Sequence, residues 1–137
     1  MKKTGLTELV ELMEYMRGEK GCLWDREQKL EDFLVHLKNE SDEVLQAIGK
    51  NDSENLREEL GDLLWNIIFI SQIAREKGEF DIYDVMEDVK KKIIRRHPHV
   101  FGCVKANTVD EVKAAYMKVK EREKLLSPKP EKEDDGN

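Results

Sequence analysis

The chain has 137 residues, enough for one domain with a hydrophobic core that needs no disulfide support. Lysine and arginine number 24 against 30 aspartate and glutamate residues, so the formal net charge is −6, which argues against a nucleic-acid partner. Aromatic residues make up only 7% of the chain, with 8 glycines and 3 prolines, a shortage of turn residues that argues against sandwiches and barrels and favours an all-α fold.

The first two predicted helices follow from apolar residues that recur at helical spacing. This pattern predicts a helix over residues 6–17. Asp25 followed by Gln28 fits a capping box, in which the aspartate accepts hydrogen bonds from early backbone amides, so a second helical region is expected to open there. Gly49 is expected to end this region in a left-handed conformation, and a break is expected near residues 35–38.

Two longer helices are predicted in the middle of the chain. Asp52 or Ser53 can cap the first of them, which carries a wide apolar face and ends at Gly78. Asp81 starts the second, and Pro98 ends it because a proline disfavours helical geometry in the residue before it. Together these two helices carry more apolar surface than a five-helix monomer easily covers, so a homodimer or a dimer of dimers is expected.

The C-terminal part of the chain is predicted to hold a fifth helix and a tail. Thr108 and Glu111 form a second capping box, and the helix that follows runs to about residue 125. Residues 127–137 combine two prolines with a run of charge, which predicts a disordered tail. No alternating strand pattern occurs. The sequence therefore predicts a single domain over residues 1–126, a helical bundle in which further helices pack against a helical hairpin.

The cysteines and the apolar segments favour a cytoplasmic protein. Cys22 and Cys103 lie in neither a disulfide framework nor a metal-ligand spacing, which is typical of reduced thiols. Residues 1–8 carry the charge of an export signal, but no apolar region follows them. The longest apolar run, residues 63–70, is interrupted by Asn66 and is too short to cross a membrane, so it is expected to be a core segment.

Four carboxylates are the most informative residues in the sequence. Glu40 and Glu43 are three residues apart, as are Glu59 and Asp62, so each pair lies on one face of its own helix. If the chain folds as an antiparallel hairpin about Asn51, residues equally far from Asn51 lie level with each other. This register places Glu43 level with Glu59 and Glu40 level with Asp62, so four carboxylates are expected to meet.

Such a cluster requires a positive charge, because like charges repel and their burial is costly. Carboxylate oxygens without histidine or cysteine are ligands for a hard divalent cation, Mg²⁺ or Mn²⁺. The alternative is a solvated acidic face in a chain that is 39% charged. The apolar neighbours of Glu59 favour the metal. A di-iron centre is a poor fit, since none of the three histidines has a glutamate three residues before it.

A basic segment lies at the end of the helix that precedes Pro98. Lys92 and Arg96 are four residues apart on one face, and Arg95 adds a second guanidinium. Arginine forks match phosphate oxygens, which favours phosphate binding beside a metal cluster. The alternative is that these cations complement the negative end of the helix dipole.

At these residues the sequence resembles the MazG family of all-α nucleoside triphosphate pyrophosphohydrolases. The family signature, Glu-Glu-x-x-Glu, a spacer and Glu-x-x-Asp, is similar to residues 39–43 and 59–62 with 15 residues between them. Residues 21–28 resemble a family segment with Cys-Pro-Trp-Asp-x-x-Gln, and residues 95–101, Arg-Arg-His-Pro-His-Val-Phe, resemble its basic end segment. The resemblance extends over about residues 9–121.

The resemblance implies Mg²⁺-dependent cleavage of a nucleoside triphosphate between its α and β phosphates, giving the monophosphate and pyrophosphate, and a role in removing non-canonical nucleotides. It implies the metal ligands Glu40, Glu43, Glu59 and Asp62. Glu43 and Glu59 are the candidate catalytic residues, with Glu43 the first candidate to take a proton from water. Lys92, Arg95 and Arg96 would bind the triphosphate, and Trp24 would stack on a base, unless it only packs.

Three positions depart from the family pattern. Asn39 replaces the first glutamate of the signature, but it need not face the metal that Glu40 faces. Leu23 replaces the usual proline and Lys29 the usual threonine, so substrate preference is where a difference is expected. The competing hypothesis is a non-catalytic, metal-stabilised helical protein that binds nucleotides or regulates a partner.

Overall fold

The computed structural model describes residues 2–127, and the all-α prediction is confirmed: every regular element in this range is helical. None of these helices is long and apolar enough to cross a membrane. The predicted tail lies outside the described residues, apart from Ser127. The elements in chain order are α1 (Leu6–Met16), α2 (Leu23–Glu27), the 3₁₀ turn η1 (Leu30–Asp32), α3 (Phe33–Gly49), α4 (Ser53–Glu76), α5 (Ile82–Arg96), α6 (Pro98–Phe101) and α7 (Val109–Leu126).

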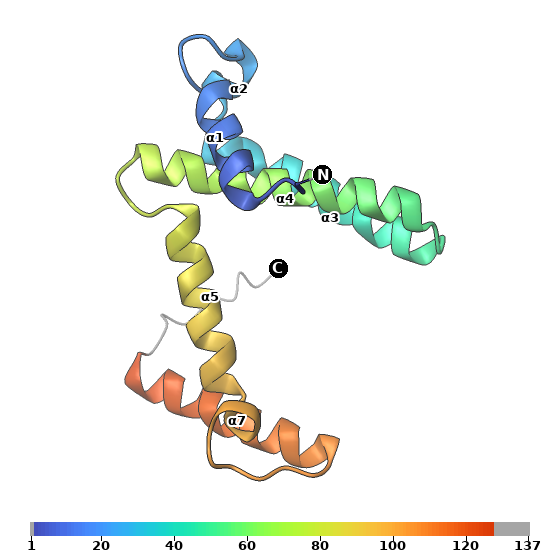
Figure 1. Cartoon of the computed structure of the whole chain (residues 1–137), viewed down its shortest axis with the longest axis vertical. Helices are drawn as coiled ribbons and strands as arrows, with labels where there is room; N and C mark the ends of the chain where they lie inside the picture. The colour runs from blue at the N-terminus through green and yellow to red at the C-terminus, as the bar shows by residue number, and fades with distance from the viewer. Residues whose placement is uncertain (1, 128–137) are drawn as a thin grey trace, which may run out of the picture. The chain divides into compact units, whose positions relative to one another are not determined.

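The chain divides into two compact units, residues 1–85 and 86–137. In the first unit, α3 and α4 form the predicted antiparallel hairpin, and α1 packs against α4 (Figure 1). The turn between α3 and α4 differs from the prediction. Gly49 is still helical, and Asn51 instead takes the left-handed conformation, with φ of 52°, which asparagine tolerates better than most residues.

In the first unit, side-chain caps mark the starts of α4 and α5, and a glycine follows the end of α4. Asp52 caps α4 as predicted, since its Oδ1 accepts a hydrogen bond from the Asn55 amide at 3.1 Å. Gly78 follows α4 in the left-handed region, with φ of 75°. Asp81 accepts from the Asp84 amide at 3.0 Å, which confirms the predicted start of α5.

The predicted start of the second helical region is wrong. Asp25 does not open a long helix but is buried within the short α2, and α3 begins only at Phe33. The break lies at Lys29, whose backbone is extended and whose amide donates to the Asp32 carboxylate at 2.8 Å. Helix α3 is therefore continuous through residues 35–38, where a break was expected.

The core of the first unit lies between α1, the start of α3, the second half of α4 and the start of α5. Arg17 borders this core: its guanidinium lies 5.3 Å from the Phe69 ring centroid, donates to Glu76 at 2.7 Å and donates to the Asp25 carbonyl. These bonds hold the α2 segment against α4. The buried apolar core residues are Val10, Met13, Phe33, Ile68, Phe69, Ile73 and Ile82.

In the second unit, Pro98 ends the long helix as predicted but also opens the single-turn helix α6. Thr108 caps α7, because its Oγ1 accepts from the Glu111 amide at 3.2 Å, and α7 extends to Leu126. The end of α5 and the start of α7 agree with the predictions. Helix α6 was not predicted, because a helix of four residues is too short to show a periodic pattern.

Candidate metal centre and its adjoining pocket

The hairpin register places the four predicted carboxylates together. Phe33 and Phe69, equally far from Asn51, have ring centroids 4.9 Å apart, which fixes the predicted register. The four carboxylates lie further along the same faces. Each offers one oxygen, and these oxygens all lie within 4.8 Å of one another in the cluster of Glu40, Glu43, Glu59 and Asp62.

The electrostatics of this cluster favour a cation or a bound proton. Glu40 and Glu59 are half-buried, and one oxygen of each is buried without a hydrogen-bond partner among residues 2–127. A hydrogen bond with Glu43, burial and repulsion by the other carboxylates raise the pKa of Glu59 to about 7. Burial, followed by repulsion from Glu43 and Asp62, raises the pKa of Glu40.

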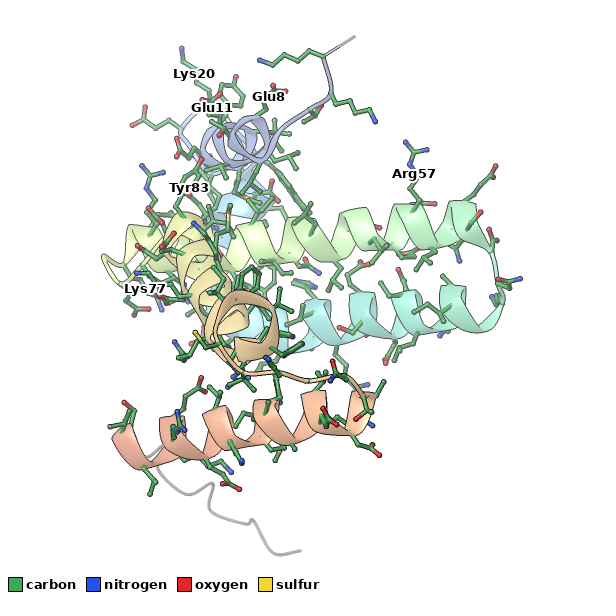
Figure 2. The ribbon with its side chains drawn as sticks, turned by 60° about the horizontal axis from the view of Figure 1, so that its bottom comes forward. Glu8, Glu11, Lys20, Arg57, Lys77 and Tyr83 are labelled. Carbon is green, nitrogen blue, oxygen red and sulfur yellow. The ribbon has the colours of Figure 1, made fainter. Side chains whose placement is uncertain are left out.

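The protein supplies no positive charge to this cluster within the part of the chain that the structure describes. None of the ion pairs found there involves the four carboxylates. Arg57 is on the same helix as Glu59 but projects from α4 away from α3 (Figure 2). A set of oxygen ligands with buried, unpartnered atoms fits a hard divalent cation. Its role as a metal site stays a prediction.

A pocket of about 290 Å³ adjoins the cluster and shares Glu40 and Glu43 with it. Aromatic side chains form part of its walls, and polar and acidic side chains form the rest. Trp24, on α2, is exposed over 56% of its surface, and its ring centroid lies 5.5 Å from that of His36. The structure thus brings Trp24, one of the predicted substrate-binding residues, into the pocket that Glu40 and Glu43 also line. The rest of its lining consists of Phe33, Asn39, Trp65, Asn66 and Phe69.

Gln28 joins the short α2 to the hairpin at this pocket. Its Oε1 lies 3.0 Å from His36 Nε2, and its Nε2 donates to the Trp24 carbonyl at 3.2 Å. His36 also lies edge-on to the Phe33 ring, with centroids 5.4 Å apart. Sequence reasoning treated Gln28 as a helix cap and missed this bridge, because the bridge depends on how α2 folds back.

Comparison with known proteins identifies the family. A family model described as the MazG nucleotide pyrophosphohydrolase domain matches residues 28–101, more than half of the chain. The chain belongs to the MazG family. This match includes all four carboxylates of the cluster and the segment that contains Gln28 and His36.

Curated relatives and a solved MazG-related structure agree with this assignment. The nucleoside triphosphate pyrophosphohydrolase/pyrophosphatase MazG of Thermotoga maritima is 46% identical over 104 residues, 74% of this chain and 41% of that protein. The nucleoside triphosphate pyrophosphohydrolase of Escherichia coli K12 is 39% identical over 120 residues, 87% of this chain and 46% of that protein. The chain spans less than half the length of these relatives. The crystal structure of a mazG-related protein from Thermotoga maritima matches with a TM-score of 0.71 and 28% identity, over 85% of this chain and 99% of that one.

The basic residues of the MazG-like end segment belong to the second unit. Lys92 is exposed on α5. Arg95 donates to Glu123 of α7 at 2.6 Å, and Arg96 donates to Glu123 at 2.9 Å and to the Tyr116 hydroxyl at 3.1 Å. Both arginines predicted to bind phosphate are therefore engaged by one carboxylate, so phosphate binding would compete with Glu123.

The ion pairs of Arg95 and Arg96 with Glu123 predict a contribution to stability that is lost in acid. Hydrogen bonds from Arg96 and Arg95 lower the pKa of Glu123 to about 2, against an ordinary value of 4.5. The stabilisation is therefore complete above pH 4.5 and is lost as the pH falls toward 2. We expect thermal unfolding, followed by circular dichroism, to show Glu123→Gln less stable than the wild type at pH 7, with the difference shrinking between pH 4.5 and 2. A difference that persists unchanged at pH 2 would contradict this assignment.

Proposed function

We propose that the protein is a Mg²⁺-dependent pyrophosphohydrolase that converts a nucleoside triphosphate and water into the monophosphate and pyrophosphate. The observation that carries the proposal is that one oxygen from each of four carboxylates lies within 4.8 Å of the others in a MazG domain, with no ion pair to them from a cation among residues 2–127. The relatives from Thermotoga maritima and Escherichia coli, which are named as nucleoside triphosphate pyrophosphohydrolases, support the same reaction.

Glu40, Glu43, Glu59 and Asp62 would hold Mg²⁺, or Mn²⁺ in its place. The bound cation supplies charge neutralisation for the phosphate oxygens and acidifies water. The chain contributes the fixed positions of the carboxylates. The register of α3 against α4 that pairs Phe33 with Phe69 also brings the four carboxylates together. A cation held there would offset the repulsion by the other carboxylates, which raises the pKa of Glu59 together with the hydrogen bond with Glu43 and burial.

One glutamate of the cluster would also act on a proton. Glu43 is exposed while Glu59 is half-buried, so Glu43 can contact both the solvent and the cluster. In the proposed reaction a water oxygen forms a bond to the α phosphorus and one of its protons passes to Glu43. The bond between the α phosphorus and the oxygen that bridges to the β phosphorus breaks, and pyrophosphate leaves with that oxygen. Glu59 remains the second candidate for this proton.

Lys92, Arg95 and Arg96 are proposed to bind the triphosphate, and Trp24 to contact the base. For the arginines this requires phosphate oxygens to replace Glu123 as their partner. Trp24 is available without such an exchange, because it lies in a pocket wall with more than half of its surface exposed.

The test of the proposal is pyrophosphate release from canonical and modified nucleoside triphosphates in Mg²⁺ and in EDTA. Release in Mg²⁺ that stops in EDTA supports the proposal, and the ranking of substrates describes the base preference. Nucleotide binding without any release would instead support the non-catalytic binding protein.

Metal binding should also appear as a stability change. We expect Mg²⁺ to raise the melting temperature of the wild type at pH 7.5, because it binds only the folded cluster. Glu59→Gln should raise the melting temperature in EDTA, since it removes one repelling charge, and should reduce the increment caused by Mg²⁺. Equal Mg²⁺ increments in wild type and variant, measured by scanning fluorimetry, would count against a metal at this cluster.

We also propose a homodimer or a dimer of dimers. Large apolar side chains are exposed along the hairpin and on α5, including Leu60, Ile67, Val89 and Ile93. Single exposed apolar residues are common on protein surfaces, but this many large ones indicate an interface that association would cover. Size-exclusion chromatography with light scattering should give a mass of at least twice 16.0 kDa. A mass equal to the single chain would contradict the proposal.

A further inference from the structure

The faces of α3 and α4 that carry the carboxylates change character along the hairpin. Phe33 and Phe69 pack at one end and the carboxylates lie toward the turn. The register places His36 and Asn66 level with each other between these two regions, and both line the pocket. A ligand that binds the carboxylate cluster through a cation can therefore extend along the hairpin toward Asn66 and the aromatic pair.

Two side chains that line this pocket have a buried polar atom without a hydrogen-bond partner among residues 2–127: Glu40, which belongs to the carboxylate cluster, and Asn66. Asn66 is 91% buried, since only 9% of its surface is exposed, and its unpartnered atom is Nδ2. Its neighbour across the hairpin, His36, is already paired with Gln28 at 3.0 Å. A buried amide without a partner is unfavourable, so the site is completed by a ligand that offers hydrogen-bonding groups.

The surroundings of Asn66 indicate what kind of ligand this is. Trp24, Phe33, Trp65 and Phe69 give the pocket aromatic walls, which suit a flat ring. An asparagine amide presents one donor and one acceptor side by side, and rotation about χ2 can turn either toward the pocket. This pair matches the edge of a nucleobase, where a donor adjoins an acceptor.

We propose that Asn66 is a specificity residue that hydrogen-bonds the polar edge of a nucleobase held in this pocket. The inference rests on the proposed function, since it takes the ligand to be a nucleoside phosphate whose phosphates reach the carboxylate cluster. Asn66 lies one helical turn after Asp62, so the base and the metal-bound phosphates would occupy neighbouring levels of the same hairpin. Asn66 acts in recognition and does not contact the bond that breaks.

The test compares Asn66→Leu with a matched control, Asn55→Leu, which makes the same change on α4 outside the pocket. We expect Asn66→Leu to raise KM for nucleoside triphosphates by roughly 10- to 100-fold with a smaller effect on kcat. Hydrolysis of methyl triphosphate, which has no base, should not change. Melting temperature should stay equal or rise, because an unpaired buried amide is replaced by an apolar group. A merely structural asparagine would lower it.

A second measurement separates this inference from the proposed function. Quenching of tryptophan fluorescence by a nucleoside monophosphate, with Trp24 and Trp65 in the pocket walls, reports base binding without turnover. Binding that is weakened roughly 10-fold or more in Asn66→Leu supports the inference even if no triphosphate is hydrolysed. If the wild type is active and Asn66→Leu matches Asn55→Leu on every nucleotide, or loses methyl triphosphate hydrolysis equally, the inference is overturned.

Discussion

Glu59→Gln is expected to reduce pyrophosphate release by about 100-fold or more at saturating Mg²⁺. The substitution keeps the shape of the side chain but removes one negative charge from a cluster whose oxygens lie within 4.8 Å of each other. It also removes a group that can accept a proton. The measurement is kcat with a pyrophosphate-coupled assay across a range of Mg²⁺ concentrations.

Glu58→Gln is the matched control for this variant. Glu58 precedes Glu59, is exposed, and lies outside the carboxylate cluster. Because Glu58→Gln also removes one negative charge, it changes the net charge of the chain by the same amount. Activity close to that of the wild type is expected for Glu58→Gln. If both variants lose activity to the same extent, the effect is one of general charge and the assigned role of Glu59 is wrong.

Ile68→Ala is expected to lower the free energy of unfolding by about 2 to 5 kcal/mol. Ile68 is only 1% exposed and lies in the core that α1 and α4 share. Truncation removes buried methyl groups and leaves a cavity that close-packed neighbours fill poorly. Urea unfolding followed by circular dichroism measures the change.

The adjacent residue provides the comparison. Ile67 has 40% of its surface exposed, so Ile67→Ala loses less buried area in the folded chain and should cost clearly less than Ile68→Ala. Equal losses for the two variants, measured under conditions where light scattering gives the mass of the single chain, would mean that the face of α4 assigned to the core is wrong.

The sequence predicted the long helices because their ends depend on local chemistry. Asp52, Asp81 and Thr108 accept hydrogen bonds from amides three residues later, and these caps can be read from neighbouring residues alone. The hairpin register was also predictable, because a short turn at Asn51 leaves little freedom in how α3 and α4 align. That register was enough to bring the four carboxylates together.

The segment between α1 and α3 could not be predicted in the same way. Its short helix is held by Arg17, whose guanidinium reaches the carbonyls of Asp25 and Gln28. These are tertiary contacts, so the local pattern at Asp25 suggested a cap that does not form. The turn was misjudged for another reason: Asn51 can adopt positive φ, and Gly49 was therefore not required to do so.

The pocket was visible in the sequence only as an irregularity. Asn66 interrupts an otherwise apolar run, which signals a polar requirement without indicating its partner. Its meaning depends on the level of His36 across the hairpin and on the bond between His36 and Gln28. Recognition residues of this kind need the folded hairpin before they can be identified.

The carboxylate cluster is proposed to support hydrolysis that releases pyrophosphate. The most direct measurement is ³¹P NMR of the products formed from a nucleoside triphosphate in Mg²⁺ by the wild type and by Glu59→Gln. We expect resonances of the monophosphate and pyrophosphate with the wild type and almost none with the variant. Formation of the diphosphate and inorganic phosphate, or equal product from both proteins, would contradict it.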